Sequence, residues 1–225
     1  MNDEQGSEYD RLFYPFLFEG GKASIEDVLT QVRHSTIEKC NEVIALRRMT
    51  LEHTGPQIVA AGQAMAHAFA SGATLFAFGN GGSTTDAQDM VTELLNPPFA
   101  HWSPLPAIAL TNDMAVVTAV GNDVGFDNIF LRQIIAFGRK GDIALGISTS
   151  GNSTNVLTAL QQARKQGLLT FGLTGYDGGK MLKSQVIDMC INVSSDHIPR
   201  IQEAQATVYH ALLEVIHAIL GTQPM

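Results

Sequence analysis

Thr74-Leu-Phe-Ala-Phe-Gly-Asn-Gly-Gly-Ser83 is a β-rich apolar run that opens into a glycine loop, with a helical stretch directly after it. The same succession of run, loop and helix repeats along the chain. The predicted strands are residues 74–78, 106–110, 143–147, 168–173 and 186–193. Strands that alternate with helices pair in parallel, and continuous apolar runs are typical of strands buried on both faces. The sequence therefore predicts an α/β fold with a five-stranded parallel sheet in three α/β/α layers, and ligands at the carboxyl ends of the strands.

An arm and two helices are predicted ahead of the first strand. Residues 1–23 are acidic and then aromatic, without a helical or alternating period, and are interpreted as an N-terminal arm. A first helix begins at Ser24 and ends near Glu52. Gly55-Pro56 begins a second, alanine-rich helix, which ends at Ser71-Gly72 because glycine can adopt the left-handed cap conformation.

Composition limits the classes of function. The 225 residues carry 22 acidic and 14 basic side chains, a formal net charge of −8, so direct nucleic-acid binding is not expected. The sequence has two distant cysteines, and it shows neither a leader nor a run of about 20 apolar residues. These features favour a cytoplasmic protein with free thiols and no membrane partner. Only 16% of residues are charged, which suggests apolar surface covered by other subunits and hence a homo-oligomer. Residues 24–225 are expected to form a single domain.

The loop Gly79-Asn-Gly-Gly-Ser83 has the residue types of an anion site. Glycines let backbone N–H groups approach an anion, and the following helix adds the partial positive charge of its N-terminus. The loop lacks the third glycine of GxGxxG and the Gly-Lys-Ser/Thr of a P-loop, which disfavours a nucleotide triphosphate. A tight structural turn is the alternative.

A second loop, Ser148-Thr-Ser-Gly-Asn-Ser153, directly precedes a helix predicted over Thr154–Gln166. Its four hydroxyl side chains and the helix N-terminus can surround a dianionic phosphate with neutral donors. The implied ligand is a phosphate monoester. An elaborate N-cap is the alternative, but two such loops at strand ends of one sheet favour binding.

Five motifs in order resemble the sugar isomerase (SIS) domain, and specifically the phosphoheptose isomerase group, over about residues 35–220. The motifs are Gly79-Asn-Gly-Gly-Ser-x-x-Asp-Ala-Gln88, Gly121-Asn-Asp123, Ile147-Ser-Thr-Ser-Gly-Asn-Ser153, Leu173-Thr-Gly-x-Asp-Gly-Gly179 and Arg200-Ile-Gln-Glu203. The resemblance implies a flavodoxin-like fold and a homotetramer with active sites between subunits. It also implies conversion of sedoheptulose 7-phosphate to D-glycero-manno-heptose 7-phosphate, often with zinc.

The resemblance assigns Glu93 and His210 as the acid/base pair. An aldose–ketose isomerisation through an enediol needs such a pair, because one group takes a carbon-bound proton while another protonates the carbonyl oxygen. Taken alone, a solvated carboxylate and a packed core histidine would be the ordinary interpretation of these two residues. The substrate contacts implied are Asn80, Gly81, Gly82, Ser83, Asn122, Asp123, Ser148, Thr149, Ser150, Ser153 and Gln202.

The metal ligands implied by the resemblance are Asp89, Glu93, Gln202 and His210, but position 89 is a histidine in the usual pattern. Asp89 and Glu93 stand at i and i+4 and share a helix face, and a carboxylate can bind zinc. Such a site is more oxygen-rich, which makes manganese or no metal an alternative to zinc.

Three further departures from the pattern concern the substrate. Leu95-Asn96-Pro97 replaces Thr-Gly-Arg and removes an arginine that would help to hold the sugar phosphate. Pro199 stands in place of an aspartate, and Gln205 in place of a second histidine. These departures keep two other hypotheses open: a non-catalytic phosphosugar sensor or protein-binding module, such as the relative that binds the replication initiator, and other chemistry on a phosphosugar.

Overall fold

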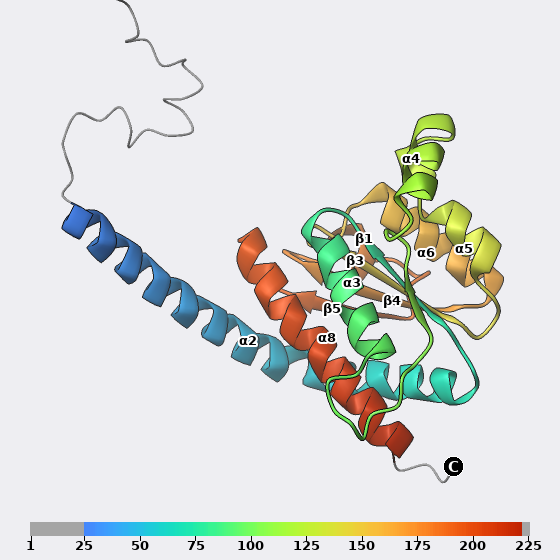
Figure 1. Ribbon diagram of the computed structural model, residues 1–225, viewed down its shortest axis with the longest axis horizontal. Helices are drawn as coiled ribbons and strands as arrows, with labels where there is room; N and C mark the ends of the chain where they lie inside the picture. The colour runs from blue at the N-terminus through green and yellow to red at the C-terminus, as the bar shows by residue number, and fades with distance from the viewer. Residues whose placement is uncertain (1–24, 222–225) are drawn as a thin grey trace, which may run out of the picture. The chain divides into compact units, whose positions relative to one another are not determined.

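The computed structural model describes residues 25–221 (Figure 1). The predicted arm, residues 1–23, and Ser24 at the predicted helix start lie outside the described residues. The chain divides into two compact units, residues 1–41 and 42–225. The described part of the first unit is the beginning of helix α2, and the second unit holds the sheet and every later helix. No helix in the described part of the chain is long and apolar enough to span a membrane.

Helix α2 is one continuous helix, Ile25–Ala70, so the prediction of two helices separated at Gly55-Pro56 is wrong. Pro56 lies inside it and removes one backbone donor, at a cost of about 3 kcal/mol. The buried positions continue past the proline at helical spacing. They include Val43, Leu46, Thr50, Thr54, Ile58, Ala61 and Met65. Each large apolar side chain in this series contributes about 1.5–3 kcal/mol on burial, so the continuous face outweighs the local penalty.

The predicted five-stranded parallel sheet is confirmed. Its strands are β1 (Leu75–Gly79), β2 (Ala107–Ala109), β3 (Ile143–Ser148), β4 (Leu169–Gly175) and β5 (Met189–Val193). They pair in parallel in the order β2-β1-β3-β4-β5. The chain leaves β1 for β2 on one side, while β3 lies on the other, so the β1/β3 boundary is the switch point where ligands of open α/β sheets bind.

The fifth strand is shorter than predicted. It begins at Met189 rather than at residue 186. The carboxylate of Asp188 accepts the backbone N–H of Thr170 at 2.9 Å, where a strand residue would offer its carbonyl. The backbone N–H of Asp188 still donates to the Thr170 carbonyl at 2.9 Å, so a side-chain bond and a backbone bond together join β4 to the residue just before β5.

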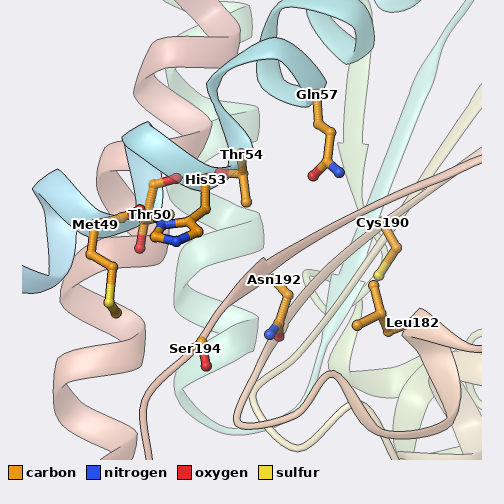
Figure 2. Close-up of a pocket in the computed structure, with 9 residues that line it drawn as sticks. All are labelled: Met49, Thr50, His53, Thr54, Gln57, Leu182, Cys190, Asn192 and Ser194. Atoms are coloured by element: carbon orange, nitrogen blue, oxygen red, sulfur yellow. Dashed lines mark hydrogen bonds between the residues drawn. The ribbon is translucent and has the colours of Figure 1, made fainter.

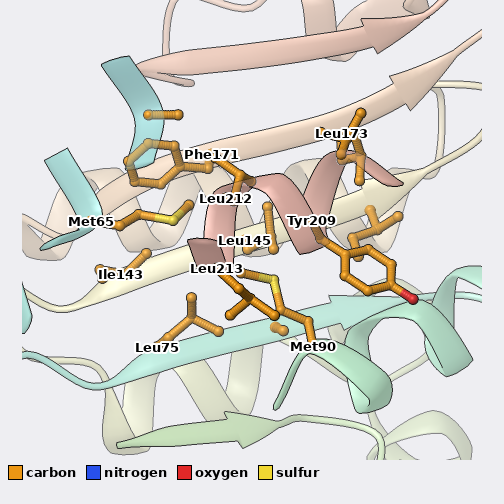
Figure 3. Close-up of a cluster of buried hydrophobic side chains, with 14 of the residues drawn as sticks. Met65, Leu75, Met90, Ile143, Leu145, Phe171, Leu173, Tyr209, Leu212 and Leu213 are labelled. Carbon is orange, nitrogen blue, oxygen red and sulfur yellow. The ribbon is translucent and has the colours of Figure 1, made fainter. Parts of the chain in front are cut away.

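The helices after α2 are α3 (Gly82–Leu95), α4 (Met114–Asp123), α5 (Leu131–Phe137), α6 (Thr154–Gln166), α7 (Gly179–Leu182) and α8 (Ile198–Gly221), with a 3-10 turn η2 (Phe126–Asn128). Residues of α3 and α8 pack with one face of the sheet in one core, and residues of α5 and α6 pack with the other face in a second core (Figure 1). Strand β1 shows the alternation: Leu75 and Ala77 belong to the first core, and Phe76 and Phe78 to the second. The three-layer prediction is confirmed, and Figure 3 shows the first core, with Tyr209 and Leu213 of α8 beside Met90 of α3.

Candidate active site

The loop after β1 leads into α3 with its backbone exposed to a ligand. Gly81 has φ of +55°, in the left-handed region that favours glycine, and it is the N-cap residue of α3. Within the described residues, no side chain donates or accepts a capping hydrogen bond for Gly81. The N-terminus of α3 therefore has no side-chain cap, and the binding of an anion there stays a prediction.

The loop after β3 has the same arrangement ahead of α6. Ser153 is the N-cap residue of α6, yet its hydroxyl lies 2.9 Å from the hydroxyl of Ser148 and makes no capping bond to the described helix. Gly151 has φ of +63°, and a Cβ at this position would lie 2.0 Å from the carbonyl oxygen of Gly178. Close backbone packing thus requires glycine at position 151. The hydroxyl groups of Ser148 and Ser153 contact each other, and the Ser153 hydroxyl does not cap the helix.

The two loops are joined by a pair of amide side chains. Asn80 Nδ2 donates to Asn155 Oδ1, and Asn155 Nδ2 donates to Asn80 Oδ1, both at 2.9 Å. Because β1 and β3 are neighbours, with Gly79 opposite Ile147, the loops lie side by side at the switch point. Asn155, which is buried, was not among the predicted site residues, and no feature of its sequence context marks it.

Glu93 and His210 meet across α3 and α8. His210 Nε2 lies 3.2 Å from Glu93 Oε1, and the two side chains are 44% and 27% exposed, respectively. Asp89 lies one turn before Glu93, and its Oδ2 is 3.8 Å from His210 Nε2. One chain therefore brings the predicted acid/base pair together, which the sequence left open.

Two residues beside this cluster have shifted pKa values. Burial, and to a smaller extent the neighbouring Asp89 carboxylate, raise the pKa of Asp86 to about 6. Burial also raises the pKa of Tyr209, whose hydroxyl donates to Asp89 Oδ2 at 2.7 Å. Tyr209 was not predicted as a site residue, because its position next to His210 in a helix does not reveal that both reach α3.

Gln202 lies over the first loop. A Cβ added to Gly82 would lie 1.8 Å from Gln202 Nε2, so the absence of a side chain at residue 82 makes room for this amide. Gln202 therefore links α8 to the glycine loop, in keeping with its predicted place in the site.

For the other predicted substrate contacts, the described residues show no interaction that links them to the cluster of Asp89, Glu93 and His210. Asn122 and Asp123 lie exposed at the end of α4, where Asn122 Nδ2 donates to Asp123 Oδ1 at 2.6 Å. Ser83 is buried in the first turn of α3. Thr149 and Ser150 are half-buried in the second loop. Their roles stay predictions.

The side chains present fit a divalent cation. Asp89, Glu93 and His210 each offer one ligand atom, and these atoms lie within 4.8 Å of one another. Two carboxylates and one imidazole suit metals that accept oxygen and nitrogen ligands, and Gln202 lies earlier in the same helix as His210.

A separate cavity of about 370 Å³ lies between α2, α7 and β5, in the second unit (Figure 2). Met49, His53, Cys190 and Asn192 are among its lining residues, and none of the predicted site residues lines it. Burial raises the pKa of the Cys190 thiol, which disfavours the reactive thiolate.

Comparison with known proteins shows the family to which the chain belongs. Residues 39–175 match the model of the SIS domain. The phosphoheptose isomerase of Geotalea daltonii is 43% identical over 184 residues, which cover 80% of this chain and 95% of the relative. That of Rhodospirillum rubrum is 47% identical over 161 residues, which cover 72% of this chain and 84% of the relative.

Solved structures give the same result. The phosphoheptose isomerase of Neisseria gonorrhoeae superposes with a TM-score of 0.77 at 34% identity, covering 83% of this chain and 99% of that one. The enzyme of Francisella tularensis also gives 0.77, at 35% identity, covering 85% and 98%. Fold and loops thus define a phosphosugar domain of the SIS class, and this chain belongs to the SIS domain family. Within that family it belongs to the phosphoheptose isomerase group of aldose–ketose isomerases.

Proposed function

We propose that the protein interconverts sedoheptulose 7-phosphate and D-glycero-manno-heptose 7-phosphate through an enediol, with Glu93 and His210 as the acid/base pair. The observation that carries this proposal is the 3.2 Å approach of His210 Nε2 to Glu93 Oε1 in a half-exposed position. The names of its relatives support the substrate, and the two open loops support binding of a phosphate monoester.

The loops hold the substrate by its phosphate. Backbone N–H groups at the N-termini of α3 and α6, together with the hydroxyls of Ser148, Ser150 and Ser153, supply neutral donors to the dianion. In this proposal the phosphate would lie at the switch point of the sheet, and the sugar would extend from there toward α3 and α8. Asn80, Gln202, Asn122 and Asp123 would contact the hydroxyl groups of the sugar.

The reacting carbons then lie between Glu93 and His210. The Glu93 carboxylate takes the proton from one of the two carbons and returns it to the other, while His210 transfers the proton of the carbonyl oxygen. An imidazole has one protonated and one free ring nitrogen when it is neutral, so it can both donate and accept in one turnover. The pair is already in hydrogen-bond contact, so substrate has to enter between the two groups.

A divalent cation at Asp89, Glu93, Gln202 and His210 would polarise the carbonyl and hydroxyl oxygens of the sugar. Because the donor set is rich in oxygen, manganese is an alternative to zinc at this site. The same nitrogen lone pair of His210 cannot bind a metal and accept a proton at once. With a metal on Nε2, proton transfer by His210 would have to use its other ring nitrogen, Nδ1.

Deuterium exchange tests the isomerisation. Sedoheptulose 7-phosphate and a panel of pentose and hexose phosphates are incubated with the protein in D₂O, with chelator or with added zinc or manganese, and followed by NMR. Deuterium should enter C1 or C2 of the true substrate. The exchange should disappear in Glu93→Gln, because the amide cannot take the carbon-bound proton.

Glu214→Gln is the matched control, since Glu214 is an exposed carboxylate of α8 outside the cluster, and it should exchange normally. Binding of sugar phosphates without exchange under any metal condition contradicts the isomerase proposal and favours a phosphosugar sensor.

We also propose that the chain works as a homotetramer. Helix α4 is rich in apolar residues, yet none of its residues is buried in the single chain, and Met114 is 61% exposed. Apolar surface of this kind is normally covered in an assembly. Light scattering coupled to size exclusion measures the mass directly, and a monomer at micromolar concentration would contradict the proposal.

A further inference from the structure

Tyr209 has an unusual place for a core residue. It is 3% exposed, and its ring packs among the apolar residues shared by α3, α8 and the sheet (Figure 3). Its hydroxyl reaches the edge of that core and donates to Asp89 Oδ2 at 2.7 Å. A rigid, buried ring thus holds a carboxylate that is itself 52% exposed.

The anchored carboxylate belongs to the three-residue cluster. Asp89 Oδ2, the atom that accepts from Tyr209, is also the atom 3.8 Å from His210 Nε2. An ionised carboxylate has about four lone-pair positions, so one hydrogen bond leaves positions for a cation. Without the anchor, an exposed aspartate on a helix would sample several side-chain rotamers, and most of these point away from Glu93 and His210.

We propose that Tyr209 is a positioning residue, whose hydroxyl fixes the Asp89 carboxylate against Glu93 and His210 and so sets the affinity of the cluster for a divalent cation. This inference rests on the metal ligands in the proposed function. It does not require that the substrate be a heptose phosphate. Removing a hydrogen bond that a neighbouring residue makes to a metal ligand typically lowers metal affinity 10–100-fold.

The competing explanation is purely structural. A buried tyrosine hydroxyl usually needs a partner, and Asp89 could serve Tyr209 rather than the reverse. The two explanations differ in what the loss of the hydroxyl changes. A structural role alters the stability of the fold, whereas a positioning role alters metal binding, and only when Asp89 is present.

The test is a double-mutant cycle on metal affinity. Chelator-stripped full-length protein, Tyr209→Phe, Asp89→Ala and the double variant are titrated with Mn²⁺ and with Zn²⁺ alone by calorimetry, with thermal unfolding recorded in parallel. We expect Tyr209→Phe to weaken Mn²⁺ binding about 10-fold or more. In the Asp89→Ala background, the same substitution should have almost no further effect, because the carboxylate that it positions is gone.

Equal loss in both backgrounds, unchanged affinity in Tyr209→Phe, or a wild-type protein that binds neither ion overturns the proposal. If Tyr209→Phe does not fold, the wild-type protein labelled with ¹³C at tyrosine Cζ gives a second readout. The Tyr209 signal, assigned with Tyr9→Phe, Tyr14→Phe and Tyr176→Phe, should move on Zn²⁺ binding and should not move in Asp89→Ala.

This experiment separates the inference from the proposed function. Metal affinity is measured without any sugar, so a protein that fails to exchange deuterium can still show the coupling between Tyr209 and Asp89. Conversely, exchange that persists in chelator with no metal binding overturns the positioning role and leaves the isomerase proposal intact.

Discussion

Two histidines on α8 show how one helix carries both chemistry and packing. His210 is half-exposed and faces the carboxylates of Glu93 and Asp89. His217 lies seven residues later on nearly the same face, yet it is 5% exposed and stacks on Trp102 with ring centroids 4.3 Å apart. The residue type and the helix are the same, so the difference comes from the element opposite: a helix bearing carboxylates in one case, and an aromatic loop in the other.

The largest effect expected from this contrast is on catalysis. His210→Gln should lower kcat about 10²–10⁴-fold, the usual contribution of a positioned acid/base group, while leaving the melting temperature close to that of the wild type. Steady-state kinetics with the substrate found by deuterium exchange measures kcat, and calorimetry measures the melting temperature. A variant that keeps near-normal kcat would remove His210 from the acid/base pair.

Removing the aromatic ring that stacks on His217 should lower stability and leave catalysis nearly unchanged. Trp102→Ala removes the ring that covers His217, and we expect a loss of about 2–3 kcal/mol in unfolding free energy, less than for a fully buried tryptophan because Trp102 is half-buried. Urea unfolding gives the free energy. The isomerase should keep its kcat within a few-fold, and a loss of kcat comparable to that of His210→Gln would contradict a purely packing role.

The smallest effect is the pH dependence of stability. Burial, and then the nearby His101, lower the pKa of His217 from its ordinary value of 6.5. Below pH 6.5 the unfolded chain therefore binds a proton that the folded chain refuses, so unfolding free energy should fall as the pH drops from 7 toward 5.

His217→Phe keeps a ring against Trp102 and removes the titration, so its unfolding free energy should fall less over the same pH range. His34→Gln, a change at an exposed helical histidine, is the control and should keep the wild-type slope. An unchanged slope in His217→Phe would assign the pH dependence to other groups.

The fold was predictable because its signals are local. Continuous apolar runs, each closed by a glycine or hydroxyl loop, marked the five strands, and the helix Thr154–Gln166 was predicted with the bounds that the structure shows. The predicted break at Pro56 failed because a local penalty of about 3 kcal/mol competes with a buried face that continues on both sides of it.

The candidate site was predictable in part. The phosphate-type loops could be found because their residues are contiguous, and the motif resemblance supplied Glu93 and His210. Asn155 and Tyr209 could not be found in this way. Each acts through a partner far along the chain, Asn80 in one case and Asp89 in the other, and neither belongs to a recognised motif.

The sequence by itself determined the parallel sheet and the glycine and hydroxyl loops at the ends of its strands, because each depends on neighbours within a few positions. Glu93 and His210 came from the family resemblance instead. The tertiary structure alone decided that Glu93 and His210 meet within one chain, that Tyr209 holds Asp89, and that His217 is covered by Trp102. These contacts join residues about a hundred positions apart. Their geometry depends on how α3, α8 and the loop before β2 pack on the sheet, which no local pattern specifies.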